Sequence, residues 1–280
     1  MKRLFIFIMA VSMLIAADVF AAGIDELMPV LKQVKQSINA TLSEIDKDLA
    51  SAAKQLSVVD LKGEAARKIL NDLRKFRPYV VNCSIIDANG LKITVEPQTY
   101  QKYEGADRAE LPSVIRLLKD KKPVVSDVYY AAEGINAISI GYPIFSDKGE
   151  LLGAVRMLIR HELFLKPMVE GKPCMIWIMQ PNGLLMYDPD PGETGKNIFT
   201  DPLFKPFEDL VSFSKTVALS NSGAGSYDFY ANGLQDKTLT RKMAVWDTVG
   251  LYGTEWRVIA VDIERTLEEK QLASAAQIKD

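Results

Sequence analysis

Few residues of this chain have side chains that carry out covalent chemistry, and those few do not cluster. His161 is the only histidine, and no nucleophile motif lies near it, so it lacks the partners of a catalytic triad. The two cysteines, Cys83 and Cys174, are too far apart in the sequence to form a zinc-binding motif. We therefore interpret His161 as a bystander, predict no enzymatic activity, and expect neither a metal site nor a cofactor.

One acidic segment comes nearest to a calcium-binding loop, with Asp188, Asp190 and Glu193 closely spaced. The calcium pattern is not met, because Pro191 and Gly192 come too early in the segment. We interpret the segment as a solvated turn.

The same strand–turn–strand pattern occurs twice, around Asn89-Gly90 and around Asn182-Gly183, each with apolar residues on both sides. Asn-Gly predicts a type I′ hairpin, because both central residues of that turn adopt positive φ. Two such hairpins predict two small α/β modules in tandem, and without a catalytic motif they favour binding over catalysis. Cys83 and Cys174 each precede one hairpin, and a disulfide between them and two free thiols both remain open, with free thiols favoured.

Residues 1–22 have the pattern of a signal peptide. Lys2 and Arg3 are followed by an uncharged, mostly apolar stretch over Leu4–Ala17 and then by small residues. The alternative is an uncleaved membrane anchor, but Asp18 interrupts the apolar stretch before the roughly 20 residues that a spanning helix needs. We therefore expect a cleaved leader and a periplasmic or secreted protein, with N-terminal anchoring as the alternative.

The composition is that of a globular protein, with 48% hydrophobic and 25% charged residues. The length of 280 residues is enough for one large or two ordinary domains. A net charge of −2 argues against nucleic acid as a partner.

A heptad rhythm follows the leader. Apolar residues recur in alternating steps of four and three at Ile38, Leu42, Ile45, Leu49, Ala52, Leu56 and Val59. This rhythm predicts a long helix over about residues 24–60, and a shorter helix is expected over 64–76. The apolar stripe suits a homodimer through the long helix, and it equally suits packing against the chain's own modules.

Apolar alternation and turn residues predict two groups of strands behind the helices. In the first group we expect strands over 80–86, 91–95, 124–131, 137–145 and 151–159, with a helix over 109–119. In the second we expect a hairpin over 174–187, strands over 225–230, 242–249 and 256–262, and a helix over 203–211. Helices over 161–169 and 264–276 complete the chain. The short hairpin turns imply antiparallel sheets.

Several short motifs occur in a fixed order along the first group of strands. A G-x-D turn lies at Gly105–Asp107, a P-x-x-S strand at Pro123–Ser126, a P-I-x-x-x-x-G hairpin at Pro143–Gly149, and an exit strand follows from Gly153. This order resembles the double Cache (dCache) sensor domains of bacterial and archaeal receptors. The resemblance covers roughly residues 24–265.

The resemblance implies an α+β fold in which a long N-terminal helix precedes two PAS-like (Cache) antiparallel-sheet modules. The expected domains are a signal peptide over 1–22, the long helix with a short second helix over 23–77, a membrane-distal-type Cache module over 78–165, a second Cache-like module over 166–265 and a C-terminal helical tail over 266–280. The sequence shows no second transmembrane helix and no kinase, cyclase or methyl-accepting region. We therefore expect a stand-alone sensor that signals through a membrane receptor.

The resemblance also implies a small-metabolite pocket in the first module, with the strands Ser126–Tyr130 and Leu151–Arg160 as its walls. Tyr129 falls where amino-acid-binding members place a ligand-contacting tyrosine. The charged anchors of those members are absent, because Leu111–Val114 stands in place of their arginine motif and Leu158 in place of their aspartate. We therefore do not expect an α-amino acid as ligand.

Arg156 offers a substitute anchor. It lies two residues before Leu158, so both side chains point to the same face of the strand. Because a planar guanidinium suits a carboxylate, we hypothesise a small organic acid as ligand, with an arginine on a solvated strand face as the alternative. Asp127 and Tyr142 are further ligand-binding candidates, whose alternatives are a surface and a core position respectively.

Taken together, the sequence predicts a periplasmic ligand-binding sensor that takes part in signal transduction such as chemotaxis. Its partners would be a small-molecule ligand and a membrane receptor. The alternative is a structural or interaction protein that binds no metabolite and dimerises through the heptad helix.

Overall fold

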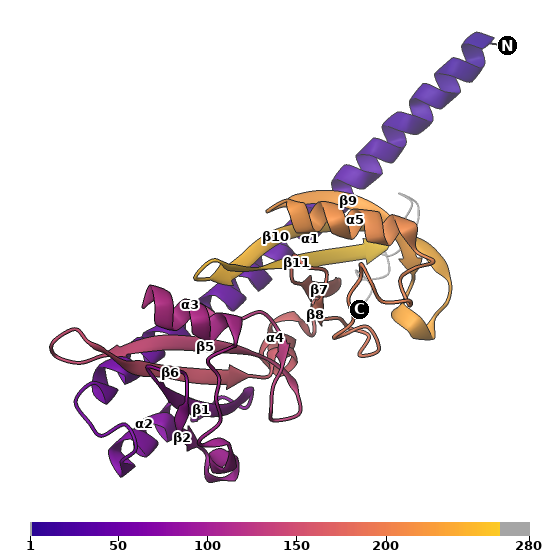
Figure 1. The fold of residues 1–280 in the computed structure, drawn as a ribbon. Helices are drawn as coiled ribbons and strands as arrows, with labels where there is room; N and C mark the ends of the chain where they lie inside the picture. Colours follow the sequence, from indigo (N-terminus) through magenta and orange to yellow (C-terminus); the bar gives the residue numbers. More distant parts are fainter. Residues whose placement is uncertain (1, 264–280) are drawn as a thin grey trace, which may run out of the picture. The chain divides into compact units, whose positions relative to one another are not determined.

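The structure is a computed structural model that describes the backbone of residues 2–263 and the side chains of residues 23–262 (Figure 1). The chain divides into two compact units. The six-stranded unit comprises Gln36–Glu170 and Val249–Trp256, and the five-stranded unit comprises Gly171–Thr248 with the flanking segments up to Lys35 and from Arg257. The predicted tail helix over 264–276 and the tail domain over 266–280 lie outside the described residues.

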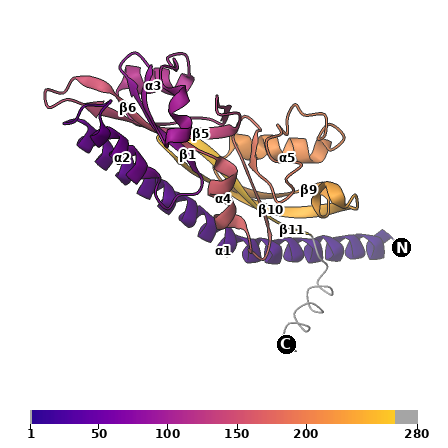
Figure 2. The same cartoon turned by 90° about the horizontal axis from the view of Figure 1, so that it is seen from below.

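A single helix, α1 (Lys2–Leu56), forms the N-terminal part of the chain and is continuous in both views (Figures 1 and 2). It begins well before residue 24, where the sequence predicts its start. The predicted apolar stripe is at most 2% exposed at six positions, namely Ile38, Leu42, Ile45, Leu49, Ala52 and Leu56. The six-stranded unit thus buries the stripe without a second copy of the chain, and a homodimer through this helix stays a prediction.

The first sheet has the strand order β2-β1-β6-β5-β3, and β4 pairs with β5. Its strands are β1 (Val80–Asp87), β2 (Lys92–Glu96), β3 (Val124–Val125), β4 (Tyr129–Tyr130), β5 (Asn136–Phe145) and β6 (Leu151–Ile159). The helix α2 (Glu64–Arg74) packs on β1 and β2, and α3 (Pro112–Asp120) packs on β5 and β6 (Figure 1). The short helix η1 (Gln98–Tyr103) follows β2, and α4 (His161–Val169) follows β6 as predicted. In the strand order given above, β6 lies in the middle, between β1 and β5.

The strand predicted over residues 124–131 is wrong as one element, because the structure divides it into β3 and β4. The side chain of Ser126 causes the interruption. Its hydroxyl oxygen accepts a hydrogen bond from the backbone N–H of Ser139 at 2.8 Å, so a side chain takes the place of a backbone carbonyl in the ladder.

The two Asn-Gly turns are hairpins, as predicted, but the predicted turn type is wrong. Gly90 and Gly183 have φ of 89° and 90°, whereas Asn89 and Asn182 are not among the residues with positive φ. The N–H of Gly90 donates to the carbonyl of Asp87 at 3.0 Å, which closes a type I turn with the glycine in the left-handed region behind it. Positive φ is thus needed at the glycine alone.

The second sheet has the order β8-β7-β11-β10-β9. Its strands are β7 (Met175–Met179), β8 (Leu185–Tyr187), β9 (Gly223–Tyr230), β10 (Leu239–Leu251) and β11 (Thr254–Ile263), with the short helix η2 (Gly233–Gln235) between β9 and β10. The helix α5 (Glu208–Leu219) packs against β9. It starts later than the predicted residue 203, because the Asp201 carboxylate accepts the N–H of Leu203 at 2.9 Å and holds that segment in a separate turn.

The predicted fold class is confirmed: a long N-terminal helix precedes two antiparallel sheets. Cys83 is buried, Cys174 is half-buried, and both are free thiols. No helix in the described part of the chain is both long and apolar enough to cross a bilayer.

The heptad stripe yields a stability prediction. Ile45 has no solvent exposure, so Ile45→Ala leaves a cavity under α1 and is expected to lower the free energy of unfolding by about 2–5 kcal/mol. Urea unfolding followed by circular dichroism measures the change. The exposed neighbour Lys47 provides the control, since Lys47→Ala is expected to change stability by no more than about 0.5 kcal/mol. Equal effects of the two substitutions would show that the stripe is not a core element.

Candidate functional site

The six-stranded unit contains a cavity of about 70 Å³, which we call the Arg156 cavity. Arg156 and Tyr129, two of the predicted ligand-binding residues, both line it. The charged residues of its lining are Lys92, Arg108, Glu133 and Arg156. Leu111 and Leu158, which stand where amino-acid-binding dCache members are expected to carry charged anchors, also line it.

Arg156 is held in the middle of the first sheet. On β6 it pairs with Ser84 of β1 and with Gly141 of β5, and the residue is only 4% exposed. The alternative of a solvated strand face is therefore wrong. Gly141 leaves room beside it, because a Cβ at that position would come within 2.5 Å of Leu117 Cδ1 of α3 and 3.5 Å of Arg156 Cγ.

The hydrogen bonds of the Arg156 guanidinium leave most of its donors unused. Nη2 donates to Ser139 Oγ at 2.7 Å, and no carboxylate of the described residues forms an ion pair with it. A guanidinium offers five N–H donors, so a buried arginine with one protein acceptor has the capacity to bind an anion.

The one carboxylate of the cavity already has a cation. Glu133 Oε1 accepts a hydrogen bond from Lys92 Nζ at 3.0 Å and another from Asn82 Nδ2 at 2.9 Å. Burial lowers the pKa of Lys92, and the Glu133 charge opposes that shift. Burial would raise the pKa of Glu133, but Lys92 and the hydrogen bonds hold it below its ordinary value. Lys92 and Glu133 thus compensate each other, which leaves the charges of Arg156 and Arg108 in excess.

The other predicted site residues lie in different places. Tyr129 is half-buried and pairs with Ala137 at the start of β5. Asp127 is exposed and is not among the residues that line the cavity. Tyr142 pairs with Val155, the residue before Arg156, so it faces the opposite side of the sheet. The structure therefore brings Tyr129 and Arg156 together and leaves Asp127 and Tyr142 outside.

Sequence reasoning missed three charged residues of the Arg156 cavity: Lys92, Arg108 and Glu133. Strand alternation would place Lys92 on one face with Thr94 and Glu96, but a register irregularity between Ile85 and Ile86 turns Lys92 to the other face of β2, so no sequence pattern points to it. Glu133 lies in the loop between β4 and β5, where no periodicity applies, and only the folded chain shows what it faces.

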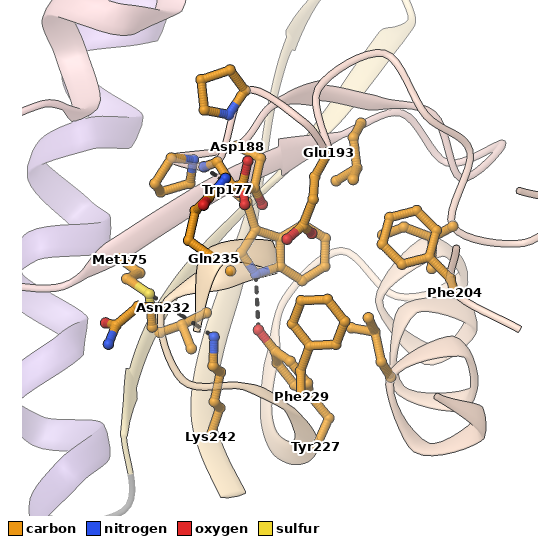
Figure 3. A pocket seen from close by; sticks show the side chains of 18 residues that line it. Met175, Trp177, Asp188, Glu193, Phe204, Tyr227, Phe229, Asn232, Gln235 and Lys242 are labelled. Carbon is orange, nitrogen blue, oxygen red and sulfur yellow. Dashed lines mark hydrogen bonds between the residues drawn. The ribbon is translucent and has the colours of Figure 1, made fainter. Parts of the chain in front are cut away.

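A larger cavity of about 390 Å³ lies in the five-stranded unit (Figure 3), and we call it the Glu193 cavity. Asp188, Asp190 and Glu193 line it, together with Lys242 and several aromatic side chains. The interpretation of the acidic segment as a solvated turn is therefore wrong, since Glu193 is only 4% exposed. Burial raises the pKa of Asp188 and of Glu193, and for Glu193 the nearby negative charge of Asp188 adds to the effect.

His161 lies at the start of α4 with no solvent exposure. Neither ring nitrogen has a hydrogen-bond partner among the described residues, and burial lowers the pKa of the imidazole to about 4. Across the described part of the chain, no group of three or more histidine, cysteine, aspartate or glutamate side chains is arranged to hold a metal ion.

Comparison with known proteins shows that the chain is similar to sensor domains. Residues 40–161 match the family model described as "HK/GC/Chemotaxis protein-like, sensor domain". The extracellular ligand binding receptor from Desulfohalobium retbaense has a TM-score of 0.70 at 28% identity, over 84% of this chain and 40% of that one. This chain thus spans less than half the length of that receptor. No curated protein sequence matches this chain.

Two further solved structures share the fold over almost their whole length. The ligand-binding domain of the Campylobacter jejuni chemoreceptor Tlp3, in complex with 4-methylisoleucine, has a TM-score of 0.65 at 11% identity and covers 88% of this chain and 92% of that one. The ligand binding domain of Mlp24 with asparagine has a TM-score of 0.60 at 17% identity, over 89% and 95%. The resemblance to Cache-like extracellular sensor domains is thereby confirmed.

The buried imidazole yields a pH prediction. The pKa of His161 is about 4 in the folded chain against 6.5 for an ordinary histidine, so below pH 6.5 the unfolded state binds a proton that the folded state excludes. Stability should therefore fall as the pH drops from 6.5 to 4, by up to about 3 kcal/mol from this residue. His161→Leu should remove that part of the acid dependence.

Urea unfolding at several pH values measures the free energy of unfolding of wild type and of His161→Leu, and thus how their difference changes with pH. Leu163→His is the control, because residue 163 is 40% exposed on the same helix and an imidazole there should keep its ordinary pKa. Parallel pH profiles of wild type and His161→Leu would contradict the prediction.

Proposed function

We propose that this Cache-like chain is a non-enzymatic, extracytoplasmic sensor domain that binds a small carboxylate in the Arg156 cavity. The bound form would be recognised by a partner receptor. Support comes from the match to a chemotaxis-type sensor model and from solved sensor domains of the same fold, two of which hold amino acids. The predicted signal peptide over residues 1–22 belongs to the same proposal, since its removal would release the sensor to the periplasm.

The observation that carries the proposal is the buried charge of Arg156. A charge removed from water costs several kcal/mol unless a counter-charge and hydrogen bonds replace the water. Ser139 supplies one acceptor at 2.7 Å, and Glu133 is occupied by Lys92. A ligand carboxylate would supply the missing charge and accept two parallel hydrogen bonds from the guanidinium.

The cavity also restricts the ligand. A volume of about 70 Å³ admits a molecule of only a few heavy atoms, such as acetate. Leu111 and Leu158 give the lining an apolar side, which suits a short alkyl chain better than a second charged group. Tyr129 also lines the cavity, and we propose that its hydroxyl donates a further hydrogen bond to the ligand. The proposal assigns no ligand contact to Asp127 or Tyr142, because neither lines the cavity.

The alternative, an interaction protein that binds no metabolite, predicts that no small anion stabilises the chain. Arg156 is buried and forms no ion pair with a carboxylate of the described residues, and this favours the sensor over that alternative. In a purely structural core, a buried charge without a counter-charge would only lower stability. The leader proposal is checked separately by the mass of the exported protein, which should lack about the first 22 residues.

The Arg156 proposal is tested by isothermal titration calorimetry with acetate and propionate as probes and acetamide, an uncharged analogue of acetate, as the control. We expect the carboxylates to bind and acetamide not to bind. Arg156→Met should weaken carboxylate binding at least tenfold, a loss of about 1.4 kcal/mol or more. The unliganded variant should unfold no more easily than wild type, because an apolar side chain of similar length removes a buried charge.

Lys119→Gln is the matched control, since it removes one positive charge from an exposed position of α3 in the same unit. It should leave the affinity within twofold. Binding that survives Arg156→Met, or no binding of either carboxylate at millimolar concentration, would remove the proposal in favour of the interaction protein.

A further inference from the structure

The Glu193 cavity has the size and the walls of a ligand site. At about 390 Å³ it lies within the range of small-molecule pockets, and it is built entirely from the five-stranded unit. Its walls come from the strands β7, β9, β10 and β11 and from the loop that follows β8 (Figure 3). The cavity is therefore separate from the Arg156 cavity and shares none of its residues.

The loop after β8 is fixed by Asp190. Its Oδ1 accepts the N–H of Gly192 at 2.8 Å and its Oδ2 accepts the N–H of Leu234 at 2.7 Å. Both carboxylate oxygens of Asp190 thus accept hydrogen bonds from backbone N–H groups. This arrangement holds the other two acidic residues, Asp188 and Glu193, at the cavity wall.

Those two carboxylates have few partners of their own. Asp188 Oδ1 accepts one hydrogen bond, from the N–H of Asp190 at 2.8 Å. Glu193 is 4% exposed, and its carboxylate has no hydrogen bond or ion pair with any residue the structure describes. Figure 3 shows that carboxylate directed toward the aromatic side chains of the cavity. An unpaired buried carboxylate is costly, so the cavity favours a positively charged occupant.

Lys242 does not compensate the pair. It is 4% exposed, its Nζ lies 3.9 Å from Met175 Sδ and 5.5 Å from the centroid of the Phe229 ring, and within the described residues it has no carboxylate oxygen within ion-pair distance. When all are ionised, the three carboxyl groups of the lining, Asp188, Asp190 and Glu193, place three negative charges against the one positive charge of Lys242. Burial raises the pKa of Asp188 and of Glu193, so full ionisation of this pair calls for a further positive charge in the cavity.

Aromatic side chains complete the lining. Trp177 donates its single N–H to the hydroxyl of Tyr227 at 3.2 Å, so the indole is fixed in orientation and offers the cavity only its apolar surface. Phe204 and Phe229 also line the cavity, and all three aromatic rings are at most 5% exposed. Aromatic faces attract organic cations and pack well against apolar groups.

We propose that the Glu193 cavity binds a small primary amine with an apolar body. The ammonium group would donate hydrogen bonds to Glu193 and Asp188, and the apolar body would pack against Trp177, Phe204 and Phe229. The proposal specifies a primary amine because the unused carboxylate oxygens accept N–H donors, which a quaternary ammonium group lacks.

Isothermal titration calorimetry with the full chain tests this assignment, with 2-phenylethylamine as the probe. Two compounds of similar size carry other charges: 3-phenylpropionate is an anion, and phenylalanine is a zwitterion. We expect the amine to bind at least tenfold more tightly than either. Tighter binding of the anion or of the zwitterion would overturn the assignment, and so would the absence of amine binding at millimolar concentration.

Three variants locate the site. Glu193→Gln and Asp188→Asn should each weaken amine binding at least tenfold, while Asp209→Asn, which removes an exposed carboxylate of α5 outside the cavity, should leave it within twofold. Thermal unfolding of the unliganded Glu193→Gln variant checks that it is folded. We expect no loss of stability, because the amide has the size of the carboxyl group, and burial already raises the pKa of that group toward its neutral form. Unchanged amine affinity in Glu193→Gln would overturn the proposal.

Arg156→Met separates the two cavities. This variant should bind the amine as wild type does, so a failure of the carboxylate proposal leaves the amine proposal standing. Loss of amine binding in Arg156→Met would show that the probe does not occupy the Glu193 cavity, and it would overturn the assignment.

Discussion

Both candidate sites depend on the cost of holding a charge inside a protein without a counter-charge. Arg156 carries such a charge in the six-stranded unit, where Ser139 is its hydrogen-bond acceptor and Glu133 is occupied by Lys92. Glu193 is the acidic counterpart in the five-stranded unit, where burial raises the pKa of its carboxyl group and Lys242 stays beyond ion-pair distance, so ionisation of Glu193 lacks a counter-charge. Because a folded chain gains stability when such a charge is neutralised, each cavity is expected to be more stable with a complementary ligand than without one.

The two units hold their charged residues by different means. Arg156 stands on a central strand, so its position is fixed by the ladders to β1 and β5, and the absence of a side chain at Gly141 leaves room beside its stem. Glu193 stands on a loop that is fixed by the side chain of Asp190 through two backbone N–H groups. Both arrangements hold the charged side chain in place before a ligand binds. A site whose side chains are already positioned loses less conformational entropy on binding.

The fold of this chain is shared with known sensor domains, whereas the side chains that line its two cavities are its own. The TM-scores of 0.65 and 0.60 with sensor domains from Tlp3 and Mlp24 come with identities of 11% and 17%, so they establish a shared fold. Which ligand a sensor of this fold binds is decided by the side chains that face its cavities. In this chain those side chains are cationic in one cavity and mainly anionic in the other, and this difference separates the two proposals.

The sequence by itself determined the features that depend on local periodicity: the heptad stripe that is buried along α1, most of the strands, the two hairpins and the place of Arg156 on β6. Strand alternation also put Arg156 and Leu158 on one face, as the cavity lining shows. The tertiary structure alone decided which charges are paired. Lys92 meets Glu133 across 41 positions of sequence. Glu193 is buried in a cavity that distant strands also line, so neither fact follows from a local pattern. Burial and charge pairing are set by residues brought together only when the chain folds, and these decide what a cavity can bind.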